Sequence, residues 1–412
     1  MMEFDLQAVT EPGKKMVLMA EEHSADFATR ADEHDSQGTF AFENVEAMKK
    51  SGFAAAAVPQ EFGGMGVTSI HDCVVAMNRL GRGDASTPLA FTMHLFRVLS
   101  TARGLNNARK TGNQARQARL EDMLRKIGAG DFIISVANSE RGADIRTSRT
   151  TATKTKGGWL FNGTKTFATG SPAANVLAVR ARYQNSAGEE RLGATMAPVD
   201  RPGVEIMNDW QGMGMRASAS HDVVFTDYFV PDEEFDDIGE FGKYNAAFLS
   251  VASGASMGLS SIFLGIAEAA QKIAVDATKE RGRADYPMNQ VTVAENEIEL
   301  AACRGILGRA AQSFDDFYQT GAGAGGVVPE VTEMEAFEII KNAATAKKYV
   351  MEKAGEIVNR AITVYGGGGF VTGSTLARLY RDVRAGPLMQ PWATNQAVEF
   401  IGKVSLGINP ND

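Results

Sequence analysis

Hydrophobic residues recur at helical spacing through the first third of the chain, over residues 11–125. Two turns rich in glycine and proline interrupt this pattern, and the first of them covers residues 59–66. Thr68 or Ser69 follows that turn, and either hydroxyl can cap the N-terminus of a new helix. The pattern therefore predicts an N-terminal helical domain over residues 1–130.

At residue 131 the hydrophobic period changes from helical to alternating. Short runs rich in β-branched and aromatic residues, bounded by glycine, asparagine and proline, are typical of strands. They lie at residues 132–136, 159–163, 176–179, 191–196 and 223–225. These runs predict a small, mostly antiparallel central β-domain over residues 131–235, which ends in the acidic stretch from Asp232 to Asp237.

The helical pattern then returns and continues over residues 236–412. Thr332 and Glu335 have the spacing of a capping box, and hydrophobic residues follow at helical spacing. A glycine-rich segment at residues 320–328 is expected to be a loop between helices. The order of helices, strands and helices predicts an α+β fold of separately packed units that ends in a C-terminal four-helix bundle.

One stretch of the C-terminal region, from Tyr244 to Ala267, contains no charged residue. A bilayer needs about 20 apolar residues, so this stretch is long enough to cross one. It is filled with alanine, glycine and serine, however, and such small residues also permit close helix packing in a soluble core. We expect a buried helix here and no membrane span.

Composition narrows the possible partners and the compartment. The net charge is -8 and the sequence pI is near 5.4, so wholesale binding of nucleic acid or of an anionic membrane is not expected. The N-terminus shows no basic region followed by an apolar run, and hence no visible secretory signal. Cys73 and Cys303 are far apart and lack metal-site spacing. These features fit a reducing, cytoplasmic compartment.

Familiar catalytic motifs do not appear in the sequence. The Gly-Met-Gly at residues 212–214 lacks the third glycine of a dinucleotide fingerprint, and there is neither a Walker loop nor an HExxH motif. The five histidines are scattered along the chain, so no metal site is expected.

Several weaker motifs do follow one another in a fixed order. They are VPQEFGGMG (58–66), NSERGAD (138–144), FNGTKTFATG (161–170), GMRAS (214–218) with VFTDYFVP (224–231), ER (280–281), and YGG (365–367) with YRD (380–382). This order resembles the acyl-CoA dehydrogenase superfamily of FAD-dependent flavoproteins. The resemblance covers nearly the whole chain and implies FAD as the cofactor.

The resemblance assigns residues of the β-domain to the flavin ring. Asn138 and Ser139 would offer polar groups to the ring edge, and Phe167 and Thr169 would stack on the ring and hydrogen-bond to it. Such contacts suit a planar cofactor with a polar edge.

The resemblance assigns a second group to the nucleotide part of FAD. Arg281 would reach the pyrophosphate of the FAD of a neighbouring subunit, although a surface arginine on a helix would have the same sequence. Gly366 and Gly367 would let that FAD lie against the backbone, and Thr363 and Thr394 would contact the nucleotide. A homotetramer is expected by the same resemblance.

The catalytic position departs from the family pattern. Family members that dehydrogenate acyl thioesters use a glutamate to remove the α-proton, and counting from Asp382 puts that position at Gln390. An amide cannot accept this proton at neutral pH. Some members carry the base on the first helix of the C-terminal domain, but the matching position is Ala255 and no acid lies between residues 244 and 267.

Three functions follow from this pattern. The first is oxidation of the α,β bond of an acyl thioester, with an acyl-CoA as substrate and a separate electron acceptor. The second is a monooxygenase of the same superfamily, which uses reduced flavin and oxygen on an aromatic, sulfur or amine substrate. The third is a flavoprotein that binds FAD or a CoA ester without turnover.

Overall fold

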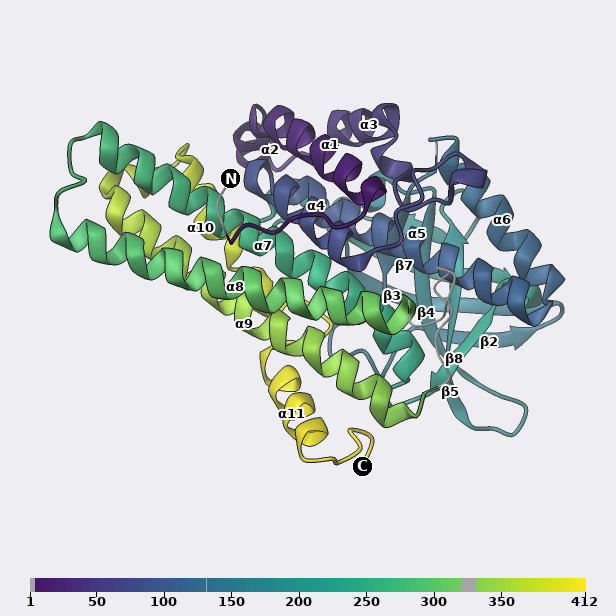
Figure 1. Ribbon diagram of the computed structural model, residues 1–412. Coiled ribbons are helices and arrows are strands. Elements are labelled where there is room, and N and C mark those ends of the chain that lie inside the picture. The colour runs from purple at the N-terminus through teal and green to yellow at the C-terminus, as the bar shows by residue number, and fades with distance from the viewer. Residues whose placement is uncertain (1–3, 131, 320–330) are drawn as a thin grey trace.

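The chain folds into a helical N-terminal part, a β-sheet and a set of long C-terminal helices (Figure 1). The computed structural model describes residues 4–130, 132–319 and 331–412. The glycine-rich loop expected at 320–328 lies outside these residues. The long C-terminal helices extend away from the sheet, and the first N-terminal helices lie along them (Figure 1).

The N-terminal helices begin where the sequence provides caps. The side chain of Thr10 caps the first helix, and Ser69 Oγ accepts the N–H of Asp72 at 3.0 Å to cap the fourth. Of the two predicted caps, Ser69 is therefore the one used. The helices are α1 (Glu11–Ala28), α2 (Ala31–Gln37), α3 (Phe42–Ser51), α4 (Ile70–Gly83), α5 (Ser86–Thr111) and α6 (Gln114–Gly128).

The central sheet has eight strands in the order β6-β7-β3-β2-β4-β5-β8, with β1 beside β4. They are β1 (Ile134–Ala137), β2 (Thr151–Thr155), β3 (Gly158–Ala168), β4 (Val176–Gln184), β5 (Glu190–Pro198), β6 (Val204–Ile206), β7 (His221–Pro231) and β8 (Asp236–Glu240). Only the pairings of β4 with β1 and β2 are parallel. The prediction of a mostly antiparallel β-domain is confirmed.

The alternating pattern did not reveal strands β2, β6 and β8. Their sequences, TATKT, VEI and DDIGE, contain few hydrophobic residues, and β6 and β8 are the edge strands of the sheet. Edge strands are exposed on more sides, so their hydrophobic signal is weak. Because β8 pairs with β5, the sheet runs five residues beyond the boundary expected at 235.

The C-terminal region contains α7 (Ala246–Glu280), α8 (Pro287–Gln319) and α9 (Glu333–Tyr365), followed by α10 (Thr375–Val383) and α11 (Thr394–Ser405). The expected bundle consists of the three long helices, with the two short helices packed on α9. The predicted capping box is confirmed, since Thr332 Oγ1 accepts the N–H of Glu335 and the Glu335 carboxylate accepts the N–H of Thr332.

The charge-free stretch forms the first half of α7. By length and composition this helix is the one candidate for a membrane span among the described residues, but most of its apolar window is buried inside the protein. Gly81 and Gly265 allow the close packing, because a Cβ on either residue would collide with the backbone of the facing helix. The small residues of α7 therefore serve helix packing, in keeping with a buried helix.

The N-terminal and C-terminal helices share one continuous hydrophobic core, whereas the sheet has a small core of its own. The predicted order of helical, β-sheet and helical regions is confirmed, and the two helical regions pack against each other. The physical reason is that α4 is buried on nearly all sides and packs against α7, so neither helical part buries its apolar residues alone. The sheet faces this common body through α5, which packs on β1.

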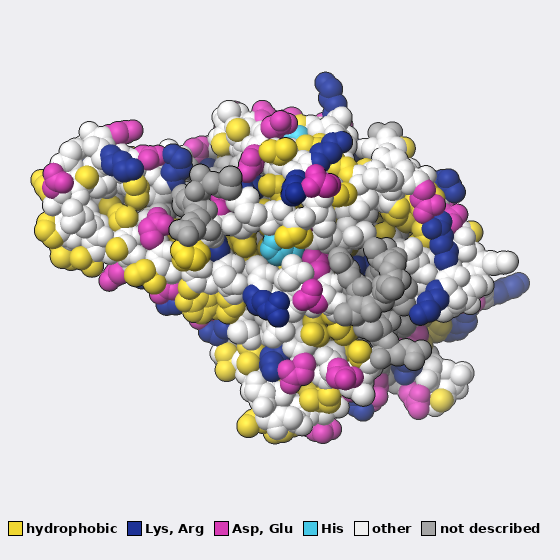
Figure 2. Space-filling view, in the orientation of Figure 1, with side chains coloured by type: hydrophobic (Ala, Val, Ile, Leu, Met, Phe, Trp, Pro, Cys, Tyr) yellow, Lys and Arg dark blue, Asp and Glu magenta, His cyan; other side chains and the backbone are white. Residues whose placement is uncertain are grey.

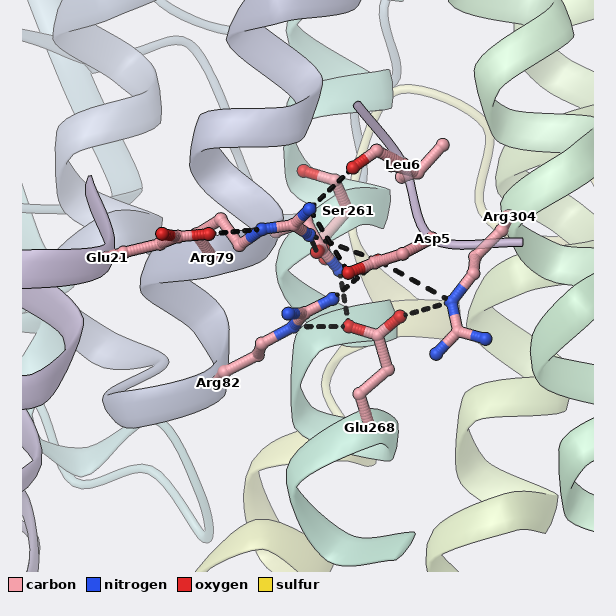
Figure 3. A network of polar contacts seen from close by, with 9 residues as sticks. Asp5, Leu6, Glu21, Arg79, Arg82, Ser261, Glu268 and Arg304 are labelled. Carbon is pink, nitrogen blue, oxygen red and sulfur yellow. Dashed lines mark hydrogen bonds and ion pairs between the residues drawn. The ribbon is translucent and has the colours of Figure 1, made fainter. Parts of the chain in front are cut away.

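A buried polar network joins the start of the chain to the same helices (Figure 3). Glu268 on α7 accepts hydrogen bonds from Arg82 and Arg304, each at 2.7 Å. Asp5 accepts from Arg82 at 2.8 Å, and Arg79 donates to Glu21 at 3.1 Å. Because each buried charge has an opposite partner, the N-terminal segment is held against α4, α7 and α8.

Candidate functional site

The predicted ring contacts meet where strands β1 and β3 end. The backbone N–H of Thr166 donates to the carbonyl of Ser139 at 2.8 Å, which forms an isolated bridge. Within the described part of the chain, Asn138 Oδ1 and Thr166 Oγ1 are buried and have no hydrogen-bond partner. A buried unpartnered polar atom is costly, so these two atoms mark a place where a polar ligand edge fits.

Phe167 presents its ring beside these atoms. Its φ of 56° lies in the left-handed region, and 59% of the residue is exposed although it is a large apolar residue. Trp210 lies edge-on to the ring, with centroids 6.0 Å apart. Thr169 Oγ1 hydrogen-bonds to Ser220 Oγ at 2.9 Å. The structure thus brings Asn138, Ser139, Phe167 and Thr169 together, as predicted, and their chemistry fits a planar ring with a polar edge.

The sheet is tied to α10 close to this place. Trp210 Nε1 donates to the carbonyl of Met215 at 3.0 Å, and the N–H of Met215 donates to Asp382 Oδ1 at 2.6 Å. Gly214 lies so close to the backbone of Arg381 that a Cβ would collide with it. Burial raises the pKa of Asp382 to about 7, against the opposing effect of Arg378. The GMRAS and YRD motifs are therefore neighbours in space.

Gln390 lies in the loop between α10 and α11, where Lys347 of α9 contacts the backbone. The Lys347 ammonium donates to the carbonyls of Met389 and Pro391, and it reaches the carbonyl of Trp392 at 3.4 Å. Burial lowers the pKa of Lys347 to about 7, while its carbonyl partners favour the charged form. Gln390 Oε1 is itself buried and has no partner among the described residues.

The same loop contacts the β-domain through aromatic side chains. Trp392 packs on Tyr244 with ring centroids 5.6 Å apart, and the Arg146 guanidinium lies 5.0 Å from the Tyr244 ring centroid. Arg146 is paired with Asp144 at 2.7 Å. Burial opposes ionisation of Asp144, but its hydrogen bonds from Arg146 outweigh burial and lower its pKa. Asp144 is therefore a poor general base, because its carboxylate holds its proton weakly and is already paired with Arg146.

The second group of predicted residues lies at the far end of the long helices. Arg281 follows α7, and its Nη1 donates to the carbonyl of Tyr365 at 2.7 Å while the guanidinium stacks 4.3 Å from the Tyr365 ring centroid. Gly366 has a φ of 88° and, like Gly367, faces open space. Thr363 is exposed at the end of α9. The side chain of Thr394 lies outside the described part of the structure.

The two predicted groups lie near opposite ends of α10. Near its start, Leu376 packs beside Gly369 and Tyr365, and Arg281 contacts Tyr365. Near its end, Asp382 accepts the N–H of Met215, which is linked through Trp210 to Phe167. The structure therefore does not place side by side the residues that the sequence assigned to one cofactor.

Sequence reasoning missed Lys347. A signal for it was present, because Lys347 falls three residues after Ala344 and four before Met351 on the apolar face of α9, where a lysine needs a partner. It also missed Trp392, whose neighbours could not be inferred from the local sequence.

Comparison with family models assigns the three parts of the chain. The N-terminal domain model of acyl-CoA dehydrogenases matches residues 15–103, the middle domain model matches 134–228 and the C-terminal domain model matches 257–389. The chain therefore belongs to the acyl-CoA dehydrogenase family of flavoproteins, and it has that fold.

Similar proteins within this family are nitrososynthases. The amino sugar nitrososynthase DnmZ of Streptomyces peucetius is 30% identical over 402 residues, which are 97% of this chain and 94% of DnmZ. The crystal structure of a nitrososynthase from Micromonospora carbonacea var. africana has a TM-score of 0.89 at 30% identity, covering 99% of this chain and 100% of that one.

A third similar structure contains ligands. The X-ray structure of KijD3 in complex with FMN and dTDP-3-amino-2,3,6-trideoxy-4-keto-3-methyl-D-glucose has a TM-score of 0.88 at 31% identity. It covers 98% of this chain and 96% of KijD3. The similarity to this flavin complex supports a flavin as the cofactor of this chain.

Proposed function

We propose that this protein is a flavin-dependent monooxygenase that oxidises the amino group of a sugar carried on a nucleoside diphosphate. The observation that carries the proposal is Gln390, which stands where the family resemblance puts the catalytic glutamate. The facing stretch of α7 has no acid either, and Asp144 is held by Arg146. A dehydrogenase of acyl thioesters needs a base at this place, whereas oxygen transfer to an amine does not.

The proposed reaction follows from what each reactant supplies. Reduced flavin supplies two electrons per cycle, and dioxygen supplies one oxygen atom to the amine nitrogen while its other atom leaves as water. A first cycle converts the amine to a hydroxylamine. A second cycle removes two further electrons and two protons from the nitrogen, so that the net product is a nitroso sugar and water.

The residues of this chain would orient the cofactor and keep water away. Asn138 and Thr166 would pair with the polar edge of the flavin, and Phe167 would cover its face. Gln390 would offer an amide that donates or accepts a hydrogen bond without removing a proton from the substrate. The similarity to DnmZ and KijD3 supports the amino sugar as substrate. We predict FAD as the cofactor, and the assay below compares it with FMN.

A direct comparison of two assays tests this proposal. Purified protein is supplied with reduced FMN or FAD, oxygen and a dTDP-linked amino sugar, and the products are analysed by mass spectrometry with isotopically heavy dioxygen. We expect label in a hydroxylamine or nitroso product. In the second assay, butyryl-CoA and octanoyl-CoA should fail to bleach the flavin under anaerobic conditions. Bleaching by an acyl-CoA, without labelled amine product, would overturn the proposal in favour of thioester oxidation.

The variant Gln390→Glu provides the matched control. It restores the carboxylate of the family pattern without changing side-chain size. We expect amine oxidation to fall and no acyl-CoA dehydrogenation to appear. A gain of dehydrogenation in Gln390→Glu would instead show that the substrate pocket is that of an acyl-CoA dehydrogenase. Absence of both activities in the native protein, with flavin still bound, would favour the non-catalytic flavoprotein.

A further inference from the structure

Helix α5 has one partly exposed stripe on an otherwise buried surface. From Ser86 to Ala102, every residue is buried except Ala90, Met93, Arg97 and Ser100. Their spacing of three, four and three residues puts them on one face of the helix. A face that solvent reaches, with buried residues on both sides of it, is open to a ligand.

Helix α7 has a matching stripe. Between Phe248 and Glu268 the partly exposed residues are Phe248, Val251, Ala252 and Ala255, which again share one face. The two helices pack directly on each other, because the Phe96 ring of α5 covers Gly258 so closely that a Cβ there would collide with it. The half-buried stripes of α5 and α7 thus belong to two helices in direct contact, and the space that these eight residues border is called the recess.

This recess begins at the candidate flavin site. A Cβ built on Gly170, the residue after Thr169, would meet the Cβ of Ala90 at 2.8 Å. One turn later, His94 Nδ1 accepts the N–H of Ile134 at 3.1 Å and so fixes α5 against β1. The stripe on α5 thus leads from the neighbourhood of Thr169 past β1 to Arg97.

Arg97 is the charged residue of this stripe, and it has no partner. Within the described ranges the structure gives its guanidinium no hydrogen bond, ion pair or aromatic contact. Burial alone lowers the pKa of Arg97, so no carboxylate of the described residues compensates its charge. By contrast, Arg103 on the same helix donates to the carbonyl of Thr68 and stacks on the Tyr318 ring. Packing an alkyl chain against an unpaired guanidinium would remove water from the charge without replacing its hydrogen bonds. An oxyanion would instead form charge-assisted hydrogen bonds with it.

We infer that the recess between α5 and α7 receives an oxyanion of the substrate and that Arg97 binds it. This inference deepens the proposed function, on which its choice of substrate rests: the oxyanion would be the diphosphate of a nucleotide sugar. The guanidinium fork matches two oxygens of a phosphate or a carboxylate, so the ligand charge compensates the half-buried positive charge. Arg97 also sets specificity, because it disfavours an unbranched acyl chain in the same space.

Binding measured without turnover tests the inference. Isothermal titration calorimetry is carried out on the full chain with thymidine diphosphate, inorganic pyrophosphate and succinate, which separate a phosphate from a carboxylate source. We expect the phosphate ligands to bind and Arg97→Met to weaken them by roughly 10- to 100-fold, the range for a hydrogen bond to a charged group. Arg97→Lys should lose less, because it keeps the charge. The exposed Arg116→Met on α6 should bind as the native protein does.

Thermal unfolding separates binding from a structural role. Since Arg97 has no partner, Arg97→Met should hold or raise the melting temperature without ligand, and the stabilisation by thymidine diphosphate should disappear. Native binding of both phosphate ligands in Arg97→Met would overturn the inference. So would a native protein that binds none of the three anions. Arg97-dependent binding of succinate alone would keep the oxyanion site and exclude the diphosphate.

The two proposals can fail separately. If the protein binds thymidine diphosphate through Arg97 but yields no oxidised amine, the proposed reaction is wrong and the anion site stands. If amine oxidation occurs with equal KM in Arg97→Met and in the native protein, the anion site is wrong and the proposed reaction stands.

Discussion

At the residue scale, the loop that follows β1 depends on one buried ion pair. Glu140 accepts the Lys165 ammonium at 2.6 Å, and it also accepts Thr150 Oγ1 at 2.5 Å and the N–H of Arg149. Both side chains of the pair are buried. Because Asn138 and Ser139 directly precede Glu140, this pair holds the predicted flavin contacts in place. Removing one partner of such a buried pair lowers protein stability more than replacing both partners with apolar residues.

We therefore expect Glu140→Gln to lower the free energy of unfolding by about 3–5 kcal/mol, since Lys165 is left as an unpaired buried charge. The double variant Glu140→Gln with Lys165→Met should recover much of this loss. Urea denaturation measures both. Asp232→Asn, which removes an exposed ion pair with Lys154, should change stability by at most about 1 kcal/mol. An equal loss of unfolding free energy in Glu140→Gln, the double variant and Asp232→Asn would show that the buried pair stabilises the protein no more than an exposed pair does.

The pair also predicts a pH dependence. Burial opposes ionisation of Glu140, but Lys165 and the hydrogen bonds outweigh it and lower its pKa from 4.5 to about 2. The unfolded chain therefore binds this proton first as the pH falls. The stabilisation is present above pH 4.5 and should be lost as the pH falls towards 2. In the double variant this part of the acid sensitivity should be absent.

At the scale of elements, α9 positions the loop between α10 and α11. Lys347 contacts three backbone carbonyls around Gln390, those of Met389, Pro391 and Trp392, although no carboxylate of the described residues pairs with it. The loop is otherwise anchored by the packing of Trp392 on Tyr244 and on Phe400, at 5.6 and 4.3 Å between ring centroids. The position of Gln390 thus depends on a helix that is distant in sequence.

Lys347→Met tests this dependence. Buried carbonyls would lose their donor, and we expect a loss of about 1–3 kcal/mol in unfolding free energy together with a larger relative fall in turnover than in substrate affinity. The adjacent Lys348→Met, which removes an exposed pair with Glu352, is the matched control and should leave turnover unchanged. Native turnover in Lys347→Met would show that the loop needs no such anchor.

At the scale of the whole molecule, the far end of the long helices carries an exposed apolar surface. Hydrophobic side chains gather at this end of the molecule (Figure 2). Met288, Val291 and Ile298 in the first half of α8 are exposed, and so is Tyr286 just before it. Phe370, after the glycine run, is 84% exposed. Patches of this kind mark interaction sites. With the separation of Arg281 from the ring contacts, they support our proposal of a homotetramer in which this end serves a neighbouring flavin.

Arg281→Ala tests that arrangement. If the guanidinium reaches the pyrophosphate of a neighbour's FAD, the variant should lose about 1.5–3 kcal/mol of FAD affinity and little FMN affinity, because FMN lacks the pyrophosphate. Flavin retention is measured by equilibrium dialysis, and the oligomeric state by light scattering after size exclusion. The exposed Arg283→Ala is the control. Unchanged FAD retention would show that Arg281 does not bind FAD and only holds the end of α9 through its hydrogen bond to the carbonyl of Tyr365.

The hydrophobic pattern alone predicted much of this protein. The period changes placed the helical and β regions, the capping box at Thr332 was correct, and the ordered motifs led to the family. These inferences succeed because helix period, caps and turns are local properties of the chain. The substitution at Gln390 was likewise visible without a structure.

Only the tertiary structure decided which distant residues meet. It joined the terminal helical regions in one core, placed α10 between Arg281 and Phe167, and placed Lys347 beneath the loop of Gln390. It also left Arg97 without a partner at a recess of α5 and α7. Such facts depend on packing between elements far apart in sequence, and a local pattern contains no information about which side chain will face which.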